Sequence, residues 1–227
     1  MAQRGWRGMN CWIVMPAHNE ERTIGGVLEA LRREGWRNII VVDDGSRDRT
    51  AEIARAQGAV VLRHERNLGL GAALRTGLQE ALRRGADCAV TFDADGQHDP
   101  RAVRAMVEAL EDADLVIGSR EFLNVPAHKR FGNFMLNLIT RLMGGPLLDS
   151  QSGMRAFSRR ALAAIPIRSD RYEVSSEIVI NARRLGLRIK EVPVKCYFTD
   201  YSKARGTTIA SGIRIFLRLI RLRALYG

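Results

Sequence analysis

Two aspartates separated by a single residue, Asp93 and Asp95, follow an apolar run and open the segment DADGQH at residues 93–98. Two carboxylates at this spacing can converge on a hard divalent cation, which prefers oxygen ligands and leaves positions open for phosphate oxygens. A calcium-binding EF-hand is excluded, because its loop requires a glutamate at the twelfth position and that position, counted from Asp93, is Arg104. The alternative is a turn in which aspartate and glycine only end a strand and cap the next helix. The surrounding elements must decide between these two interpretations.

Apolar runs with strand character alternate along the chain with segments of helical periodicity, and their lengths suit βα units. The predicted elements are strands at residues 11–16, 38–42, 59–62, 88–92 and 115–118, and helices at 20–34, 49–57, 70–84 and from 100 onward. Continuous apolar strands predict a parallel sheet covered on both faces, which binds ligands beyond the carboxyl ends of its strands. Asp43 and Asp44 close the second strand there, and Asp93 and Asp95 close the fourth.

The pattern changes after Ser119. The predicted elements in this part are helices at residues 127–143 and 175–185, a short segment at 152–157 and extended chain at 189–198. No linker rich in proline or serine, no break in composition and no internal repeat separates this part from the rest. We therefore expect one domain over residues 1–227.

The net charge of +11 predicts an anionic partner, which could be nucleic acid, nucleotide phosphates or a membrane surface. The last 33 residues carry seven cations and one acid, a net charge of +6. A nucleic-acid-binding module is the competing hypothesis outside the enzymes. The chain has no recognisable zinc-finger or RNP-type motif, and its acids lie where phosphates would have to approach, so we expect no nucleic-acid partner.

No apolar run approaches the roughly 18 residues that a transmembrane helix needs, and the first ten residues contain no apolar signal-peptide core. We therefore expect a cytoplasmic protein. The three cysteines, Cys11, Cys88 and Cys196, are far apart and form no CxxC pair. This spacing favours buried thiols over a disulfide framework or a zinc site.

Six motifs in register give the chain a family resemblance. They are PAHNEE at residues 16–21, VDDGSRDRT at 42–50, RNLG at 66–69, DADGQH at 93–98, GSR at 118–120 and DSQSGMR at 149–155. In order and spacing they resemble the inverting GT-A glycosyltransferases of family 2, and most closely the polyprenyl-phosphate (dolichyl-phosphate) mannosyl and glucosyl synthases. The resemblance covers nearly the whole chain. It implies an α/β fold of the GT-A, Rossmann-like type, with a mostly parallel sheet flanked by helices and with C-terminal amphipathic helices.

The resemblance also implies a nucleotide-sugar site. The donor-binding residues would be Pro16, His18, Glu20, Val42, Asp44, Ala94, Arg120, Lys203 and Arg205. Asp93, Asp95 and Gln97 would hold Mg²⁺ or Mn²⁺ with the diphosphate, where a cation stabilises the negative charge that builds on the leaving phosphate. His18 departs from the family pattern, which usually has an aromatic residue, often tyrosine, at this position.

Two further groups complete the expected site. Asp149 and Gln151 match family positions near the sugar, and we place them with Asp93, Asp95 and Gln97 among the catalytic residues; the alternative is a turn whose side chains cap backbone groups. The basic loop that contains Lys203 and Arg205 is a candidate for closing over the diphosphate, and the alternative is a solvated loop.

The acceptor is expected to be a lipid phosphate. Hydroxyl acceptors need a general base, whereas a phosphate monoester with a second pKa of about 6 is already an anion at pH 7 and needs cations to position it. Lys129, Arg130 and Arg155 are the predicted acceptor-binding residues. The helix at 127–143 has an apolar face wider than one packing partner requires, which suits the isoprenoid chain or an oligomer contact.

The segment 207–227 is predicted to end the chain as a basic amphipathic helix, for peripheral contact with the anionic cytoplasmic face of a membrane or for packing on the protein. We expect a hexosyltransferase that inverts the anomeric carbon and uses GDP-mannose and polyprenyl phosphate. UDP-glucose as donor, a non-lipid acceptor, and a nucleotidyltransferase are the alternatives. A nucleotidyltransferase generally has a glycine-rich loop after the first strand, where this chain has PAHNEE.

Overall fold

The computed structural model describes residues 8–122, 149 and 151–197, which build a seven-stranded sheet. Its strands are β1 Cys11–Ala17, β2 Ile39–Asp43, β3 Val60–Arg63, β4 Cys88–Thr91, β5 Leu115–Phe122, β6 Arg155–Ser158 and β7 Ile189–Cys196. They lie in the order β3-β2-β1-β4-β6-β5-β7. All run parallel except β6, which is antiparallel to β4 and β5.

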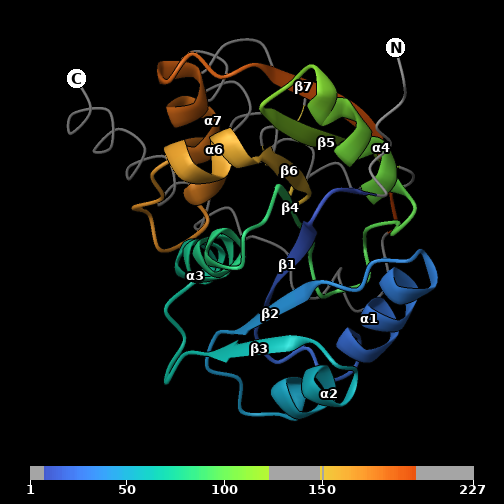
Figure 1. Cartoon of the computed structure of the whole chain (residues 1–227). Helices are drawn as coiled ribbons and strands as arrows, with labels where there is room; N and C mark the ends of the chain where they lie inside the picture. Colours follow the sequence, from blue (N-terminus) through green and yellow to red (C-terminus); the bar gives the residue numbers. More distant parts are fainter. Residues whose placement is uncertain (1–7, 123–148, 150, 198–227) are drawn as a thin grey trace.

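Helices cover both faces of the sheet (Figure 1). The α-helices are α1 Ile24–Arg33, α2 Thr50–Ala56, α3 Leu70–Arg83, α4 Ala102–Glu108, α6 Arg159–Ala164 and α7 Val174–Arg184, and the 3₁₀ turn η2 Ala109–Glu111 follows α4. One face of the sheet packs on α1, α2 and α4, and the opposite face packs on α3, α6 and α7. The expected mostly parallel α/β sheet flanked by helices is confirmed.

The central strand β1 shows why the strands are continuously apolar. Its alternate side chains Ile13 and Met15 belong to the core under α1 and α4, whereas Trp12 and Val14 belong to the core under α3. Because successive side chains of a strand point to opposite faces, a sheet covered on both sides needs apolar residues at every position. The three cysteines are buried, as expected.

The structure changes several details of the prediction. The helix predicted from residue 20 begins at Ile24. The short segment predicted at 152–157 overlaps β6, which inserts antiparallel between β4 and β5 and leads through the N-cap Ser158 into the unpredicted helix α6. The fifth strand runs four residues further than the predicted 115–118, to Phe122. The predicted helices at 127–143 and 207–227 lie outside the described residues. Among the helices that the structure describes, none has the length and apolar character needed to cross a membrane.

The connections of β1 define the ligand-binding edge. The chain proceeds from β1 to β2 on one side and returns through β3 and α3 to β4 on the other side. In such sheets, ligands bind outside the carboxyl ends of the strands at the point where the direction of strand order reverses. Pro16 pairs with Val42 and Val14 pairs with Thr91, so the loops after β1, β2 and β4 all leave from this edge.

Candidate active site

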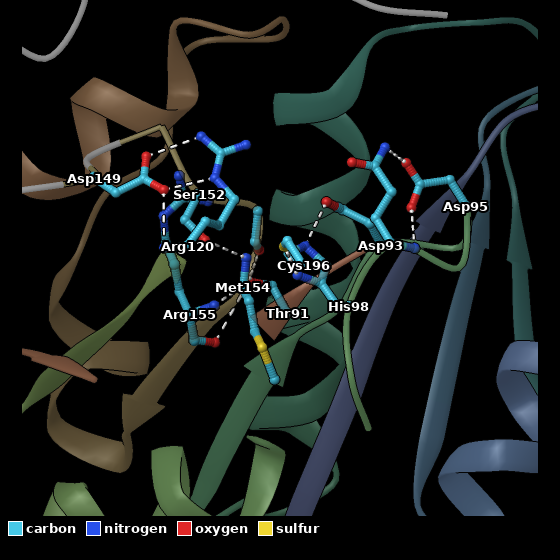
Figure 2. A network of polar contacts seen from close by, with 12 residues as sticks. Thr91, Asp93, Asp95, His98, Arg120, Asp149, Ser152, Met154, Arg155 and Cys196 are labelled. Atoms are coloured by element: carbon cyan, nitrogen blue, oxygen red, sulfur yellow. Dashed lines mark hydrogen bonds and ion pairs between the residues drawn. The ribbon is translucent and has the colours of Figure 1, made fainter. Parts of the chain in front are cut away.

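The loop after β4 carries Asp93 and Asp95 in two different environments (Figure 2). Asp93 Oδ2 accepts a hydrogen bond from His98 Nε2 at 3.0 Å. Asp95 accepts hydrogen bonds from the backbone N–H of Gln97, at 3.0 Å, and from its side-chain amide. The two carboxylates therefore have separate partners within one short loop.

The two aspartates of this loop have pKa values shifted in opposite directions. Burial opposes ionisation of Asp93, but the hydrogen bond and charge of His98, together with the charge of Arg155, hold the pKa of Asp93 below its ordinary value. Burial and the negative charge of Asp93 raise the pKa of Asp95 to about 6. Burial alone would lower the pKa of His98, yet its bonds to Asp93 and Cys196 raise it to about 10. Asp95 thus sits where nearby positive charge would favour its ionised form.

The backbone beside Asp93 leaves room for this carboxylate because residue 153 is glycine. A Cβ atom at Gly153 would lie 2.2 Å from Asp93 Oδ2 and 2.6 Å from Oδ1. Such an approach is far inside van der Waals contact, so any larger residue would displace the acid. The DSQSGMR motif, which leads into β6, therefore helps to shape the DADGQH loop.

Arg120 and Asp149 form a partly buried ion pair beside this loop (Figure 2). Arg120 Nε and Nη2 lie 2.6 and 2.9 Å from the two oxygens of Asp149, and the backbone N–H of Arg120 donates to Oδ2 at 3.2 Å. The backbone N–H of Asp149 donates to Glu191 Oε1 at 3.0 Å. Burial disfavours the charge of Arg120, but Asp149 outweighs it and raises the pKa of the guanidinium. A bidentate pair of this kind holds both side chains in one orientation.

Arg155, predicted to bind the acceptor, is fully buried in β6. Burial lowers its pKa to about 10, although the charges of Asp93 and Asp149 favour the guanidinium. Its position gives Arg155 a charge-balancing role between the two acids. The other predicted acceptor cations, Lys129 and Arg130, and the predicted closing residues, Lys203 and Arg205, lie outside the described residues.

The loops after β1 and β2 are joined on the predicted donor side. His18 Nδ1 lies 2.8 Å from the carbonyl oxygen of Asp44, and Nε2 lies 3.1 Å from Asn19 Nδ2. The backbone N–H of Glu20 donates to Thr50 Oγ1 at 2.8 Å. Pro16, His18 and Glu20 are partly exposed at this edge, so the structure brings these three predicted residues together.

Three other predicted donor residues are buried. Val42 and Ala94 have almost no exposed surface, and Asp44 is 4% exposed. The Asp44 carboxylate accepts hydrogen bonds from the backbone N–H groups of Leu68 and Gly69, at 2.9 and 2.8 Å, and contacts His64 Nδ1 at 2.7 Å. Asp44 therefore anchors the loop that begins α3, a role that the sequence analysis did not predict.

A similar anchor holds the segment that precedes α7. Glu177 accepts hydrogen bonds from the backbone N–H groups of Arg168 and Ser169, at 3.0 and 2.9 Å. Gln151, predicted near the sugar, donates to Ser176 Oγ at 3.0 Å in the same helix. Sequence motifs did not predict the roles of Glu177 and His64 or the contact of His98 with Cys196, although His98 belongs to the DADGQH motif.

Comparison with known proteins is consistent with this geometry. The model of "Glycosyl transferase family 2" matches residues 12–165. A UDP-N-acetylglucosamine–dolichyl-phosphate N-acetylglucosaminyltransferase from Methanococcus voltae is 41% identical over 93% of this chain and 95% of its own length. An undecaprenyl-phosphate mannosyltransferase from Micrococcus luteus is 34% identical over 82% of this chain and 83% of its own.

A solved structure shares the fold. Glucosyl-3-phosphoglycerate synthase from Mycobacterium tuberculosis, in complex with Mn²⁺, UDP and glucosyl-3-phosphoglycerate, superposes with a TM-score of 0.73 and 25% identity. The match covers 95% of this chain and 80% of that one. The sheet is thus of the GT-A type, and the polyprenyl-phosphate synthases implied by the motifs are among the relatives. The chain belongs to glycosyltransferase family 2.

Proposed function

We propose that this chain transfers a sugar from a nucleoside diphosphate sugar to polyprenyl phosphate, with inversion at the anomeric carbon. The observation that carries the proposal is the acidic loop at the carboxyl end of β4, next to the reversal of strand order at β1. Its Asp95 has a pKa of about 6, which favours a cationic ligand. The names of the relatives, which act on dolichyl and undecaprenyl phosphates, support the lipid acceptor.

Asp93, Asp95 and Gln97 would hold Mg²⁺ or Mn²⁺. Among the described residues no three His, Cys, Asp or Glu side chains gather as a ready-made metal site. The two carboxylates with the side-chain carbonyl oxygen of Gln97 form an all-oxygen set, which these cations prefer and which leaves positions for diphosphate oxygens. The neighbouring structure with Mn²⁺ and UDP supports this assignment. The bound cation would stabilise the charge on the departing diphosphate.

The reaction needs no proton removal if the acceptor is a phosphate. An ionised phosphate oxygen attacks the anomeric carbon, the bond from that carbon to the diphosphate oxygen breaks, and the nucleoside diphosphate leaves with the electron pair. Asp149 is suited to positioning rather than to general-base catalysis, because both of its oxygens already bond Arg120. Arg130, at the start of the predicted apolar helix, would bind the acceptor phosphate with two nitrogens.

The decisive assay offers radiolabelled GDP-mannose, UDP-glucose and UDP-N-acetylglucosamine, each with four acceptors: polyprenyl phosphate, free polyprenol, 3-phosphoglycerate and a simple sugar. We expect label to move to polyprenyl phosphate. GDP-mannose is the donor predicted from the motifs. The two uridine donors are included because the Methanococcus voltae relative is named for UDP-N-acetylglucosamine and the solved structure of glucosyl-3-phosphoglycerate synthase contains UDP. Label that reaches 3-phosphoglycerate, polyprenol or a sugar but never polyprenyl phosphate would refute the lipid-phosphate acceptor.

We also propose peripheral attachment to the cytoplasmic face of an anionic membrane. Arg214, Arg218 and Arg221 recur at the spacing of one helix stripe, and each cation near such a surface contributes about 1 kcal/mol. Truncation after Ser211 should reduce co-sedimentation with anionic liposomes more than it reduces nucleotide binding, and added salt should weaken sedimentation of the full chain. Equal sedimentation of both forms would favour packing of this segment on the protein.

A further inference from the structure

We infer that His98, itself held by Cys196, is a positioning residue that fixes the Asp93 carboxylate for the cation of the donor diphosphate. The inference rests on the proposed function, because it takes Asp93 as a ligand of that cation. It adds two side chains, one from the β4 loop and one from the end of β7, whose contact the DADGQH motif alone does not reveal.

Both ring nitrogens of His98 are engaged. Nε2 lies 3.0 Å from Asp93 Oδ2, and Nδ1 lies 3.3 Å from Cys196 Sγ, within hydrogen-bond range for sulfur. Two contacts on opposite sides of an imidazole fix the plane of the ring. The ring of Phe92 meets the His98 ring edge to face, with 5.6 Å between centroids and 65° between planes. The imidazole is thus restrained by Asp93 and Cys196 (Figure 2), and also by the ring of Phe92.

This restraint determines which oxygen of Asp93 can reach a ligand. Oδ2 accepts the hydrogen bond from His98, and the carboxylate is further confined by the backbone at Gly153. A carboxylate has two acceptor oxygens, so Oδ1 would be the one left for a cation. Rotation of the carboxylate would break the bond to His98, which makes the ring the element that holds Asp93 in register with Asp95.

The contact with Cys196 connects the loop to a distant part of the chain. Cys196 is the last residue of β7, is 1% exposed, and lies 98 positions after His98. The two residues form an isolated antiparallel bridge, and the next residue, Tyr197, donates its backbone N–H to the Gln97 carbonyl at 2.8 Å. The edge strand β7 therefore supports two proposed ligand residues, Asp93 through His98 and Gln97 through its backbone.

Two amide substitutions separate the contacts of His98. The amide nitrogen of glutamine can occupy the position of Nε2, so His98→Gln should keep the bond to Asp93. The amide nitrogen of asparagine corresponds to Nδ1, so His98→Asn should keep the contact with Cys196 and lose the one with Asp93. Cys196→Ala removes the outer contact alone. Cys11→Ala, a substitution of another buried cysteine on the central strand β1, is the matched control.

The measurement is the affinity for Mn²⁺, by electron paramagnetic resonance of free Mn²⁺, in the presence of the nucleoside diphosphate that the wild type binds. Loss of a residue that orients a metal ligand typically weakens metal binding about 10- to 100-fold. We expect His98→Asn to fall in that range, Cys196→Ala to lose about threefold or more, and His98→Gln and Cys11→Ala to stay near the wild type. Thermal unfolding of each variant shows that the comparison is made on folded protein.

Wild-type affinity in His98→Asn, or equal losses in His98→Asn and His98→Gln, would overturn the inference. If His98→Asn fails to fold, Cys196→Ala decides by itself, and unchanged Mn²⁺ affinity in that variant would overturn the role of Cys196 as the outer support. A wild-type protein that binds neither Mn²⁺ nor Mg²⁺ with any nucleoside diphosphate would instead refute the metal site of the proposed function, and this inference with it.

Discussion

Two loops flank the carboxyl end of β1 and look alike in sequence, yet their aspartates have opposite surroundings. In the β2 loop, residues 43–48, the Asp44 carboxylate is satisfied by two backbone N–H groups and by His64. In the β4 loop, residues 93–98, Asp95 accepts hydrogen bonds from Gln97 of its own loop, and burial together with the charge of Asp93 raises its pKa to about 6. The Asp44 carboxylate is held by donors from other segments, whereas the Asp95 carboxylate bonds a residue of its own loop.

The difference shows that an aspartate at the end of a strand is not by itself a ligand-binding group. Buried N–H donors favour a carboxylate and fix the adjacent loop, whereas a second carboxylate raises the cost of ionisation until a cation arrives. The β2 loop thus acts as scaffold for the start of α3. In the β4 loop, the carboxylates of Asp93 and Asp95 repel each other, and a bound cation would reduce this repulsion.

The largest expected effect concerns the chemistry of the β4 loop. Asp95→Asn removes the charge that would hold the cation of the donor, and we expect sugar transfer to fall by at least about 100-fold. Initial rates with saturating donor and acceptor, at several Mn²⁺ concentrations, measure this loss. The same substitution should abolish the increase in nucleotide affinity that Mn²⁺ produces in the wild type.

Asp99→Asn is the matched control for that experiment. Asp99 lies four residues further along and bonds Arg101, an exposed side chain. We expect its transfer rate to stay within about threefold of the wild type, because its charge is compensated locally. Retained activity of Asp95→Asn in the presence of a chelator would show that this loop does not act through a bound cation.

The next effect concerns the stability of the β2 loop. Asp44→Asn places an amide, with only one acceptor oxygen, opposite two backbone donors, of which the Gly69 N–H is buried and the Leu68 N–H partly buried. An unsatisfied buried donor costs about 1–3 kcal/mol. We expect the free energy of unfolding to fall by about 2–4 kcal/mol once the contact with His64 is included. Urea unfolding at pH 7 measures the loss.

Glu65→Gln, an exposed substitution in the neighbouring segment, should leave the free energy of unfolding unchanged within about 0.5 kcal/mol. Calorimetry on folded Asp44→Asn then tests the predicted donor contact. Weaker binding of the nucleoside diphosphate would support a contact of Asp44 with base or ribose, whereas unchanged binding would leave Asp44 with the anchoring role alone. A variant as stable as the wild type would contradict the contrast between the loops.

The sequence predicted the sheet and the acidic edge because both depend on local signals. Continuous apolar runs define strands covered on two faces, and the acids that follow them must lie at the carboxyl ends. The short strand β6 was not recognised, because it begins with Arg155 and an arginine is rarely fully buried. Only the tertiary structure, which brings Asp93 and Asp149 near this guanidinium, makes that position tolerable for a charge.

The partners of the two loops were also beyond local prediction. Asp44 bonds residues 24 and 25 positions away, and His98 contacts Cys196 across 98 positions. Asp44 and Asp95 belong to motifs with similar residue types, so sequence spacing alone could not show that Asp44 anchors a loop and that Asp95 has a raised pKa. The distinction depends on which backbone N–H groups the fold brings within hydrogen-bond distance.

The smallest expected effect is an increase in the free energy of unfolding, whereas the two larger effects are losses of activity or stability. Asp95 has an ordinary pKa of 3.8 and a pKa of about 6 in the folded protein, so the unfolded chain releases this proton more readily. A carboxylate whose pKa is raised by folding lowers the free energy of unfolding as pH increases from about 4 to about 6, and the loss persists at pH 7. Asp95→Asn cannot ionise, so it should be more stable than the wild type at pH 7 by about 1–2 kcal/mol, with allowance for the partly exposed side chain. The gain should shrink towards zero below pH 4, where the wild-type carboxyl is protonated in both states.

Urea unfolding of both proteins in a chelator between pH 4 and 7 measures this difference. A variant that is less stable than the wild type at pH 7, or a difference that does not depend on pH, would show that Asp95 is as well accommodated by the protein as Asp44.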